Sequence, residues 1–256
     1  MLVINFANLV FRGLNRNYLL NPSKNEGLRH IITVNSEFIV NSNNDPRFRE
    51  LINSSFATFD GQIPYWLAKL KNSSVKFEKI SGSDFIYDAC AHAHDHSLRV
   101  FLLGGNKLSN AAAVTTLRGR YHIDVDGYSP PHRPYPFDDH HNRKILDHIS
   151  AFEPHFLFVG FGAMKQEFWV DEHKAELESM GVRWAIGCGG TFDFVSGRIP
   201  RAPAFLQRLG LEGVYRLIRE PRWFRVKRLL KNLLIFRYVF TSRGGVESVF
   251  LFRGRS

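Results

Sequence analysis

Residues 155–173, HFLFVGFGAMKQEFWVDEH, join an apolar run to a charged one through two glycines. Residues 156–159 are aromatic and β-branched, which favours a short buried strand, and the charged run that follows favours a helix. Gly160 and Gly162 allow a sharp turn and a close approach of the backbone to a ligand. The stretch therefore predicts a strand, a tight turn and a helix whose N-terminus faces the turn. Such an N-terminus favours anions and can hold a phosphate.

The first turn of that predicted helix holds Lys165, Gln166 and Glu167. They offer a cation, an amide with donor and acceptor, and a carboxylate, which together suit a phosphorylated ligand. The alternative is an ordinary strand-to-helix turn with three solvated side chains, because a G-x-G after a strand is weak evidence by itself.

The same strand, loop and helix order repeats along the chain. We expect strands at residues 30–34, 56–59, 99–103, 121–125, 156–159 and 184–186, and helices at residues 63–71, 82–96, 107–120, 139–151 and from 165 onward. This alternation predicts an α/β fold, with a Rossmann-like, mostly parallel sheet flanked by helices. Ligands of such sheets bind at the carboxyl ends of the strands.

The composition is that of a globular protein with a sizeable core, with 256 residues, 44% hydrophobic and 23% charged. Two cysteines, Cys90 and Cys188, give no disulfide framework and suit a reducing cytoplasm. The first residues lack an early basic region and are interrupted by polar side chains, so we expect no signal peptide. No run of eighteen apolar residues occurs, so no transmembrane helix is expected.

Positive charge is concentrated at the C-terminal end. Residues 1–197 carry 20 Lys+Arg against 21 Asp+Glu, a net −1, while residues 198–256 carry 14 against 3, a net +11. We therefore predict an α/β catalytic domain at residues 1–197 and a basic helical appendage at residues 198–256. A neutral body with a basic arm indicates an anionic partner: a membrane surface, a diphosphate or a nucleic acid.

Residues 222–240 are predicted to form one basic amphipathic helix. Arg225, Arg228 and Lys231 lie on a different side from a stripe of apolar residues, which consists of Val226, Leu229, Leu230, Leu233, Phe236 and Phe240. The stripe could pack on the body as core. The charge excess instead favours contact with anionic lipid headgroups.

Polar side chains and glycines stand at or just after the predicted strand ends: Thr33, Asn35, Asp60, Gly104, Gly105, Gln166, Glu167 and Asp193. They belong to a series of motifs, in order T-V-N-S-E, F-D-G, S-G-S-D, F-L-L-G-G, V-G-F-G-A-M-K-Q-E, G-C-G-G-T-F-D-F-V-S-G-R-I-P-R-A-P and L-E-G-V-Y-R-L-I-R-E-P-R. Over residues 30–228 this series resembles the WecG/TagA/CpsF glycosyltransferases, family 26, and many ordered motifs are more specific than any single one.

The resemblance implies an inverting transfer of a sugar from a UDP-sugar to a polyprenyl-diphosphate-linked sugar, without a metal or other cofactor, in bacterial cell-surface or exopolysaccharide synthesis. It also implies a peripheral location on the cytoplasmic face of the inner membrane, with residues 222–240 on the anionic surface and no nucleic-acid partner. The C-terminal segment is expected to close over the site.

Asp60 is the expected catalytic base, because inversion needs a group that takes the proton of the acceptor hydroxyl. It follows an apolar strand, where partial desolvation would raise its pKa. Gly61 leaves room for the acceptor. Without the resemblance, an ordinary Asp-Gly turn would be the preferred interpretation.

The expected substrate-binding residues are Thr33, Asn35, Gly104, Gly105, Lys165, Gln166, Glu167, Asp193, Arg201, Arg216, Arg222 and Arg225. Thr33, Asn35 and Gln166 could bind the donor sugar, or could simply cap the helices that follow. Asp193 fits a ribose or sugar hydroxyl and equally a structural bond to the glycine-rich loop. Arg216, Arg222 and Arg225, with Arg219, could neutralise the UDP leaving group.

Three positions depart from the pattern of the family. Met164 stands where a proline is usual, Gln62 where a small residue is common, and Gly213 where a tryptophan is usual. They lie beside the matched residues and leave the donor and acceptor sugars open.

Two sequence patterns suggest metal sites but are better explained otherwise. Asp124-Val125-Asp126 matches the D-x-D of metal-dependent glycosyltransferases, yet both carboxylates are expected to face solvent. Of His92, His94 and His96, only the first and last share a helix face, and no third ligand is evident. We therefore expect no metal.

Two other functions remain open at this level. Gly160-Phe161-Gly162 could be a dinucleotide loop of an NAD(P)-dependent oxidoreductase, but Lys165 occupies the place of the third glycine. A non-catalytic protein that binds anionic surfaces would leave the residues at the strand ends unexplained.

Overall fold

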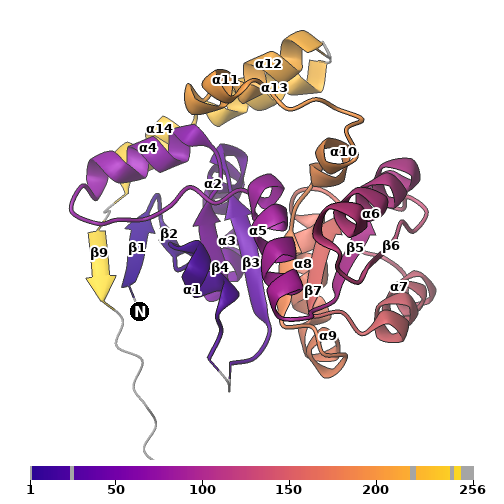
Figure 1. Ribbon diagram of the computed structural model, residues 1–256. Helices are drawn as coiled ribbons and strands as arrows, with labels where there is room; N and C mark the ends of the chain where they lie inside the picture. Colours follow the sequence, from indigo (N-terminus) through magenta and orange to yellow (C-terminus); the bar gives the residue numbers. More distant parts are fainter. Residues whose placement is uncertain (1, 24–25, 220–222, 243–244, 249–256) are drawn as a thin grey trace, which may run out of the picture. The chain divides into compact units, whose positions relative to one another are not determined.

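The computed structural model describes residues 2–23, 26–219, 223–242 and 245–248. The chain forms two compact units (Figure 1). Unit 1 consists of Met1–Asn15, Val34–Ile80 and Ala202–Ser256, and unit 2 of Arg16–Thr33 and Ser81–Arg201.

The main sheet has six parallel strands in the order β4-β3-β8-β7-β5-β6. Its strands are β3 (Arg29–Val34), β4 (Phe56–Phe59), β5 (Val100–Gly104), β6 (Val125–Tyr128), β7 (Phe156–Gly160) and β8 (Trp184–Gly187). The predicted α/β fold with a parallel sheet flanked by helices is confirmed.

Within unit 2, β3, β5 and β8 are buried along their whole length. Continuous apolar strands are typical of a parallel sheet covered on both faces. Seven helices in the described part of unit 2 accompany these strands: α1 (Arg16–Leu20), α5 (Gly82–Asp95), α6 (Lys107–Tyr121), α7 (Asp139–Phe152), α8 (Lys165–Glu172), α9 (Lys174–Ser179) and α10 (Thr191–Val195).

The strand register brings the carboxyl ends of these strands to one level. Gly104 pairs with Gly160, and Gly187 pairs with both Val159 and Ile32. The loops after β5, β7 and β8 therefore start side by side, as the repeated sequence pattern predicted.

The strand predicted at residues 121–125 is wrong by several positions. Helix α6 continues to Tyr121, and His122 ends it in the left-handed conformation with φ 52°. Because this residue reverses the chain direction after the helix, the strand begins only at Val125.

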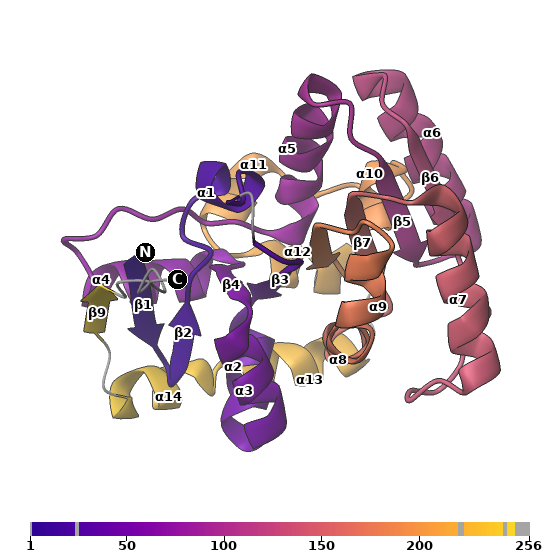
Figure 2. The ribbon, with the colours of Figure 1, turned by 90° about the horizontal axis from the view of Figure 1, so that it is seen from below.

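Unit 1 contains α2 (Ser36–Asn44), α3 (Pro46–Ser54), α4 (Gln62–Lys71), α11 (Ala204–Arg208), α12 (Glu212–Arg219), α13 (Trp223–Asn232), α14 (Ile235–Thr241) and a small antiparallel sheet of β1 (Leu2–Phe6), β2 (Leu9–Phe11) and β9 (Gly245–Ser248). The hairpin of β1 and β2, whose strands lie side by side in Figure 2, was missed from the sequence. Phe11 stacks on Phe59 with ring centroids 3.9 Å apart, so the hairpin belongs to the core of this unit.

Residues 202–256 group with the N-terminal segments of unit 1. The grouping describes which segments pack together and does not assign a function to any of them. The assignment of catalysis to residues 1–197 and of membrane contact and closure to residues 198–256 stays a prediction.

The single helix predicted for residues 222–240 is wrong, because the segment forms two helices, α13 and α14. Tertiary packing explains the break: Ile235 and Val239 are buried, and Tyr238 Oη donates to Asn44 Oδ1 of α2 at 3.1 Å. The predicted apolar stripe is largely exposed, at Leu230, Leu233, Phe236 and Phe240. Among the described residues, no helix is both long enough and apolar enough to cross a bilayer.

Candidate functional site

Glycines close the carboxyl ends of three neighbouring strands in unit 2. Gly104 and Gly105 have φ values of 88° and 70°, which residues with side chains rarely adopt. A Cβ atom at Gly104 would lie 2.8 Å from the Phe161 ring and 3.0 Å from the carbonyl oxygen of Gly160. The amide of Gly105 donates to that same carbonyl at 3.0 Å. The loops after β5 and β7 therefore pack backbone against backbone.

Gln166 joins the loops after β7 and β8. Its Oε1 accepts from the amides of Gly162 at 3.1 Å and Gly189 at 3.2 Å. Its Nε2 donates to Glu167 Oε1 at 2.7 Å, which fixes the orientation of the amide. Gly187 completes the arrangement, because a Cβ atom there would collide with Glu167 Oε1 and lie 2.6 Å from Gln166 Nε2.

Glu167 is fully buried, and burial raises the pKa of its carboxyl group to about 7, although the hydrogen bond from Gln166 acts in the opposite direction. Its Oε2 atom has no hydrogen-bond partner among the described residues. A carboxyl group sealed from solvent in this way holds Gln166 in place, so the geometry favours a positioning role for Glu167 over direct contact with a substrate.

The N-terminus of α8 has no side-chain cap. Met164 occupies the capping position with φ 68°, a value that the proline usual there in the family pattern could not adopt. Lys165 follows as the first helical residue and is half-buried. A helix N-terminus without a side-chain cap, beside a lysine, favours an anion, and phosphate binding at this turn stays a prediction.

Arg201 contacts the start of α5. Its Nη1 donates to Asp84 Oδ1 at 2.5 Å and its Nη2 to Ser83 Oγ at 3.2 Å, while Ser81 Oγ donates to Asp84 Oδ2 at 2.7 Å. The S-G-S-D and R-I-P-R-A-P motifs, over a hundred residues apart in the chain, are thus joined by an ion pair. Neither Ser83 nor Asp84 was singled out from the sequence, because only the fold brings them to Arg201.

Asp193 accepts a hydrogen bond from Ser109 Oγ at 2.5 Å, and Arg198 Nη1 donates to the same hydroxyl at 3.3 Å. Asp193 therefore bonds to the helix that follows the Gly104-Gly105 loop. Ser109 was missed, since no periodicity or motif marks it in the sequence, and Arg198, although it lies in the motif of residues 187–203, was given no role.

Thr33 is buried at the end of β3, and its Oγ1 donates to the carbonyl oxygen of Gly187 at 3.2 Å. In unit 1, Asn35 Oδ1 accepts from the amide of Phe38 at 3.1 Å and caps α2. Both side chains therefore make structural bonds. For Asn35 this is the helix cap that the sequence offered as the alternative to sugar binding. Their contacts with a donor sugar stay predictions.

Asp60, in unit 1, lies between the end of β4 and the start of α4 and is half-buried. Its amide donates to the carbonyl oxygen of Val34 at 3.0 Å. Gly61 has φ 89° and directly precedes α4, so the turn needs a glycine. The partial burial fits the environment expected for a base.

The arginines predicted to meet the diphosphate have no described side-chain geometry. Arg216, Arg219 and Arg225 lie on α12 and α13 with undescribed side chains, and Arg222 lies outside the described residues.

The family model described as "Glycosyl transferase WecG/TagA/CpsF family" matches residues 2–247. The chain belongs to this family. The match confirms the resemblance drawn over residues 30–228 and extends it to the N-terminal hairpin and to α14. Membership of a glycosyltransferase family supports the transferase class over the oxidoreductase and the non-catalytic binder.

The D-x-D pattern is placed as expected in this WecG/TagA/CpsF family member. Asp124 and Asp126 are both exposed, and Asp126 Oδ1 accepts from the amide of Gly127 at 2.8 Å. His92 and His96 stack with ring centroids 4.1 Å apart, and His94 is exposed. The described residues contain no group of three or more His, Cys, Asp or Glu side chains placed to hold a metal ion.

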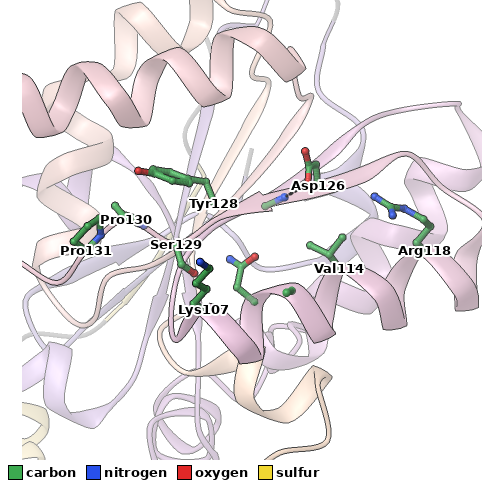
Figure 3. Close-up of a pocket in the computed structure, with 11 residues that line it drawn as sticks. Lys107, Val114, Arg118, Asp126, Tyr128, Ser129, Pro130 and Pro131 are labelled. Carbon is green, nitrogen blue, oxygen red and sulfur yellow. Dashed lines mark hydrogen bonds between the residues drawn. The ribbon is translucent and has the colours of Figure 1, made fainter.

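A cleft of about 660 Å³ lies in unit 2 between α6 and β6 (Figure 3). Lys107 and Ser129 line one part of it, and Arg118 and Asp126 line another. Ser129 Oγ donates to the carbonyl oxygen of Gly104 at 2.8 Å, so the cleft adjoins the glycine loop. No sequence pattern indicates this cleft, because its walls, α6 and the segment from β6 to Pro131, come together only in the folded chain.

Proposed function

We propose that the protein transfers a hexose or N-acetylhexosamine-type sugar from a UDP-sugar to a polyprenyl-diphosphate-linked sugar, with inversion of the anomeric centre and without a metal. The observation that carries this proposal is the set of glycine loops after β5, β7 and β8, which Gln166 links beside the uncapped N-terminus of α8. Membership of the glycosyltransferase family supports the reaction class.

The diphosphate of the donor is assigned to helix N-termini. Helix α8 begins at Lys165 and α6 at Lys107, and each follows a glycine-containing loop at a strand end. Helix α8 has no side-chain cap, whereas in α6 Asn106 Oδ1 accepts from the amide of Leu108 at 3.0 Å. The N–H groups left at each turn and the lysine beside them are proposed to stabilise phosphate oxygens without a divalent ion. Gly104 and Gly105 let the backbone come close to the ligand.

Asp60 is proposed as the base. Its carboxylate takes the proton of the acceptor hydroxyl, the hydroxyl oxygen attacks the anomeric carbon, and the bond from that carbon to the UDP oxygen breaks. The leaving diphosphate then needs positive charge, which Lys165, Arg216, Arg222 and Arg225 are proposed to supply. A single displacement of this kind inverts the anomeric centre.

The acceptor is proposed to be presented at the cytoplasmic face of the inner membrane, with the enzyme bound peripherally through residues 222–240. The exposed apolar side chains of α13 and α14, including Trp223, Leu230, Phe236 and Phe240, support this location. Exposed apolar side chains on a strongly basic segment favour an anionic lipid surface.

The proposal is tested by a panel of UDP-sugars with a short-chain polyprenyl-diphosphate sugar as acceptor. We expect UDP release that depends on the acceptor, persists in EDTA, and gives a product with inverted anomeric configuration by NMR. Stabilisation of the protein by NAD(P) and not by UDP would contradict the donor class. Activity lost on chelation and restored by manganese or magnesium would contradict the metal-independent mechanism.

A further inference from the structure

Helix α4 buries its two smallest apolar side chains and exposes two of its large ones. Its two buried residues are Pro64 and Ala68, whereas Trp66 and Leu70, one turn apart, are 43% and 79% exposed. A helix that meets only water on its outer face shows the opposite order. The outer face of α4 is therefore unlike that of a simply solvated helix.

A groove of about 420 Å³ runs along this face and is lined by Trp66, Lys69, Leu70 and Ser73. Lys69 Nζ lies 5.1 Å from the centroid of the Phe77 ring and donates to the carbonyl oxygen of Val75 at 3.3 Å. A tryptophan, an aliphatic side chain and a lysine thus stand together. This combination is typical of the headgroup region of a bilayer, where tryptophan is enriched and lysine reaches the polar boundary.

The C-terminal helices of unit 1 adjoin both ends of α4. Gly210, between α11 and α12, lies against the first turn of α4, since a Cβ atom there would be 3.4 Å from Ile63 Cγ1. In the last turn, Lys71 Nζ donates to the carbonyl oxygens of Val239, in α14, and Ser242, the latter at 3.3 Å. The last turn of α4 therefore contacts α14, which belongs to the segment that the proposed function places on the membrane.

The charge around α4 decides between partners. Residues 62–80 contain four lysines and one glutamate, a net +3, and unit 1 as a whole has 19 Lys+Arg against 8 Asp+Glu. Two copies of this positively charged surface would repel each other, which disfavours self-association through α4. An anionic bilayer supplies both the negative headgroups and an apolar layer for the two large side chains.

We propose that α4 is a second membrane-contacting helix, which inserts Trp66 and Leu70 into the headgroup boundary of an anionic bilayer beside the C-terminal helices. The inference rests on the membrane location in the proposed function. It does not depend on the identity of the donor or acceptor sugar.

The test is sedimentation of the full chain with vesicles of phosphatidylcholine and phosphatidylglycerol, without any sugar substrate. We expect the double variant Trp66→Gln/Leu70→Gln to partition into vesicles at least about tenfold less than wild type. The reason is that burial of each large apolar side chain in an apolar layer contributes strongly to the free energy of binding. The loss should persist at high salt, since it is not electrostatic. The matched control is Leu108→Gln on α6 of unit 2, 75% exposed, which should change partitioning by less than about twofold.

A second measurement reports insertion without removing either side chain. Trp169 and Trp184 are buried, so in a Trp223→Phe background Trp66 is the exposed tryptophan that remains of the four. We expect brominated lipids in the vesicles to quench its fluorescence. A Trp66→Phe/Trp223→Phe variant should show no such quenching.

Three results would overturn the inference: vesicle binding of the double variant equal to wild type, no quenching of Trp66, or no binding of wild type to anionic vesicles. Conversion of a self-associating wild type to a monomer by the double variant, with vesicle binding unchanged, would assign the face to self-association. If wild type binds vesicles through Trp66 and Leu70 but no UDP-sugar is used, the proposed function fails while this inference stands.

Discussion

The two units of the molecule differ in charge and in what they expose. Unit 2 carries 15 Lys+Arg against 16 Asp+Glu, a net −1, while unit 1 carries 19 against 8, a net +11. Of the fifteen large apolar side chains exposed in the described part of the chain, unit 2 contributes Leu108 alone. The other fourteen belong to unit 1: Leu2, Trp66, Leu70, Phe205, Leu209, Leu211, Val214, Ile218, Trp223, Leu230, Leu233, Leu234, Phe236 and Phe240.

Unit 2 pairs its polar groups internally. Gln166 is 2% exposed and bonds two glycine loops, Asp84 bonds Arg201, and Asp193 bonds Ser109. Such networks make a rigid scaffold, which suits the binding of a small polar ligand. Unit 1 combines exposed apolar surface with positive charge, which suits a large anionic surface. The contrast teaches that one chain separates a surface suited to a small polar ligand from a surface suited to a large anionic partner, as the proposed function requires.

The largest expected effect concerns the one catalytic residue that we assign to unit 1. Asp60→Asn should lower transfer by about 10²–10⁴-fold, the usual contribution of a positioned base, with UDP binding unchanged by calorimetry. The matched control is Asp126→Asn, an exposed aspartate of unit 2, which should stay within about twofold of wild type. Transfer by Asp60→Asn within about threefold of wild type would move the base elsewhere.

The next effect is a pH dependence of the stability of the protein, which comes from Glu167 of unit 2. The pKa of Glu167 is raised from 4.5 to about 7 in the folded protein, so the folded state holds more protons than the unfolded state between these values. The contribution of Glu167 to the free energy of unfolding should therefore fall by about 3 kcal/mol as the pH rises through this window, and change little on either side of it.

Glu167→Gln should remove that dependence, because the amide is neutral at every pH and its oxygen still accepts from Gln166. Urea unfolding of both proteins at a series of pH values measures the difference. Parallel stability curves for the two proteins between pH 4.5 and 7 would show that Glu167 is charged in the folded state.

A smaller effect tests the close packing of the unit 2 loops. Gly187→Ala should lower the free energy of unfolding by about 1–3 kcal/mol, because the new Cβ atom meets Glu167 and Gln166. Gly119→Ala is the control: it lies in α6 with no atom within 4 Å of its Cβ position, and should stabilise by about 0.5–1 kcal/mol. Equal stability of Gly187→Ala and wild type would show that Gln166 and Glu167 can move to make room for a methyl group at little cost.

The smallest effect compares charge in the two units. Arg228→Glu/Lys231→Glu, in α13, should weaken binding to anionic vesicles by about 1 kcal/mol per residue, less at high salt. The control reverses Arg143 and Lys144, both exposed on α7 of unit 2, and should change binding little. Equal losses in the two variants would show that net charge matters and its position does not.

Much of unit 2 was accessible from the sequence, because its signals are local. A buried strand followed by glycines and a charged helix can be recognised from one short stretch of sequence. The repetition of this order predicted the parallel sheet and the approximate bounds of most elements. The β1–β2 hairpin was missed because its strands, of five and three residues, are too short to show a clear alternation. The end of α6 was missed because a histidine, His122, stands where a glycine usually marks a left-handed helix end.

The candidate site was predicted less completely. Residues such as Thr33, Asn35, Asp60, Gln166 and Glu167 were named from their places at strand ends and from the family resemblance. Their partners were not, since Gly187, Gly189, Ser109 and Asp84 lie 20 to 154 residues away from the groups they contact or approach. No periodicity reports a contact of that range.

The sequence by itself determined the alternation of strands and helices, the glycine turns and the position of the positive charge, because these depend on neighbouring residues and on composition. Only the tertiary structure decided that Glu167 is sealed from solvent and holds Gln166, that Ile235 and Val239 rather than the predicted stripe are buried, and that α4 exposes Trp66 and Leu70. Burial is a property of what packs against a side chain. The packing partners come from distant parts of the chain, so the direction in which an amphipathic segment faces is fixed only when the chain folds.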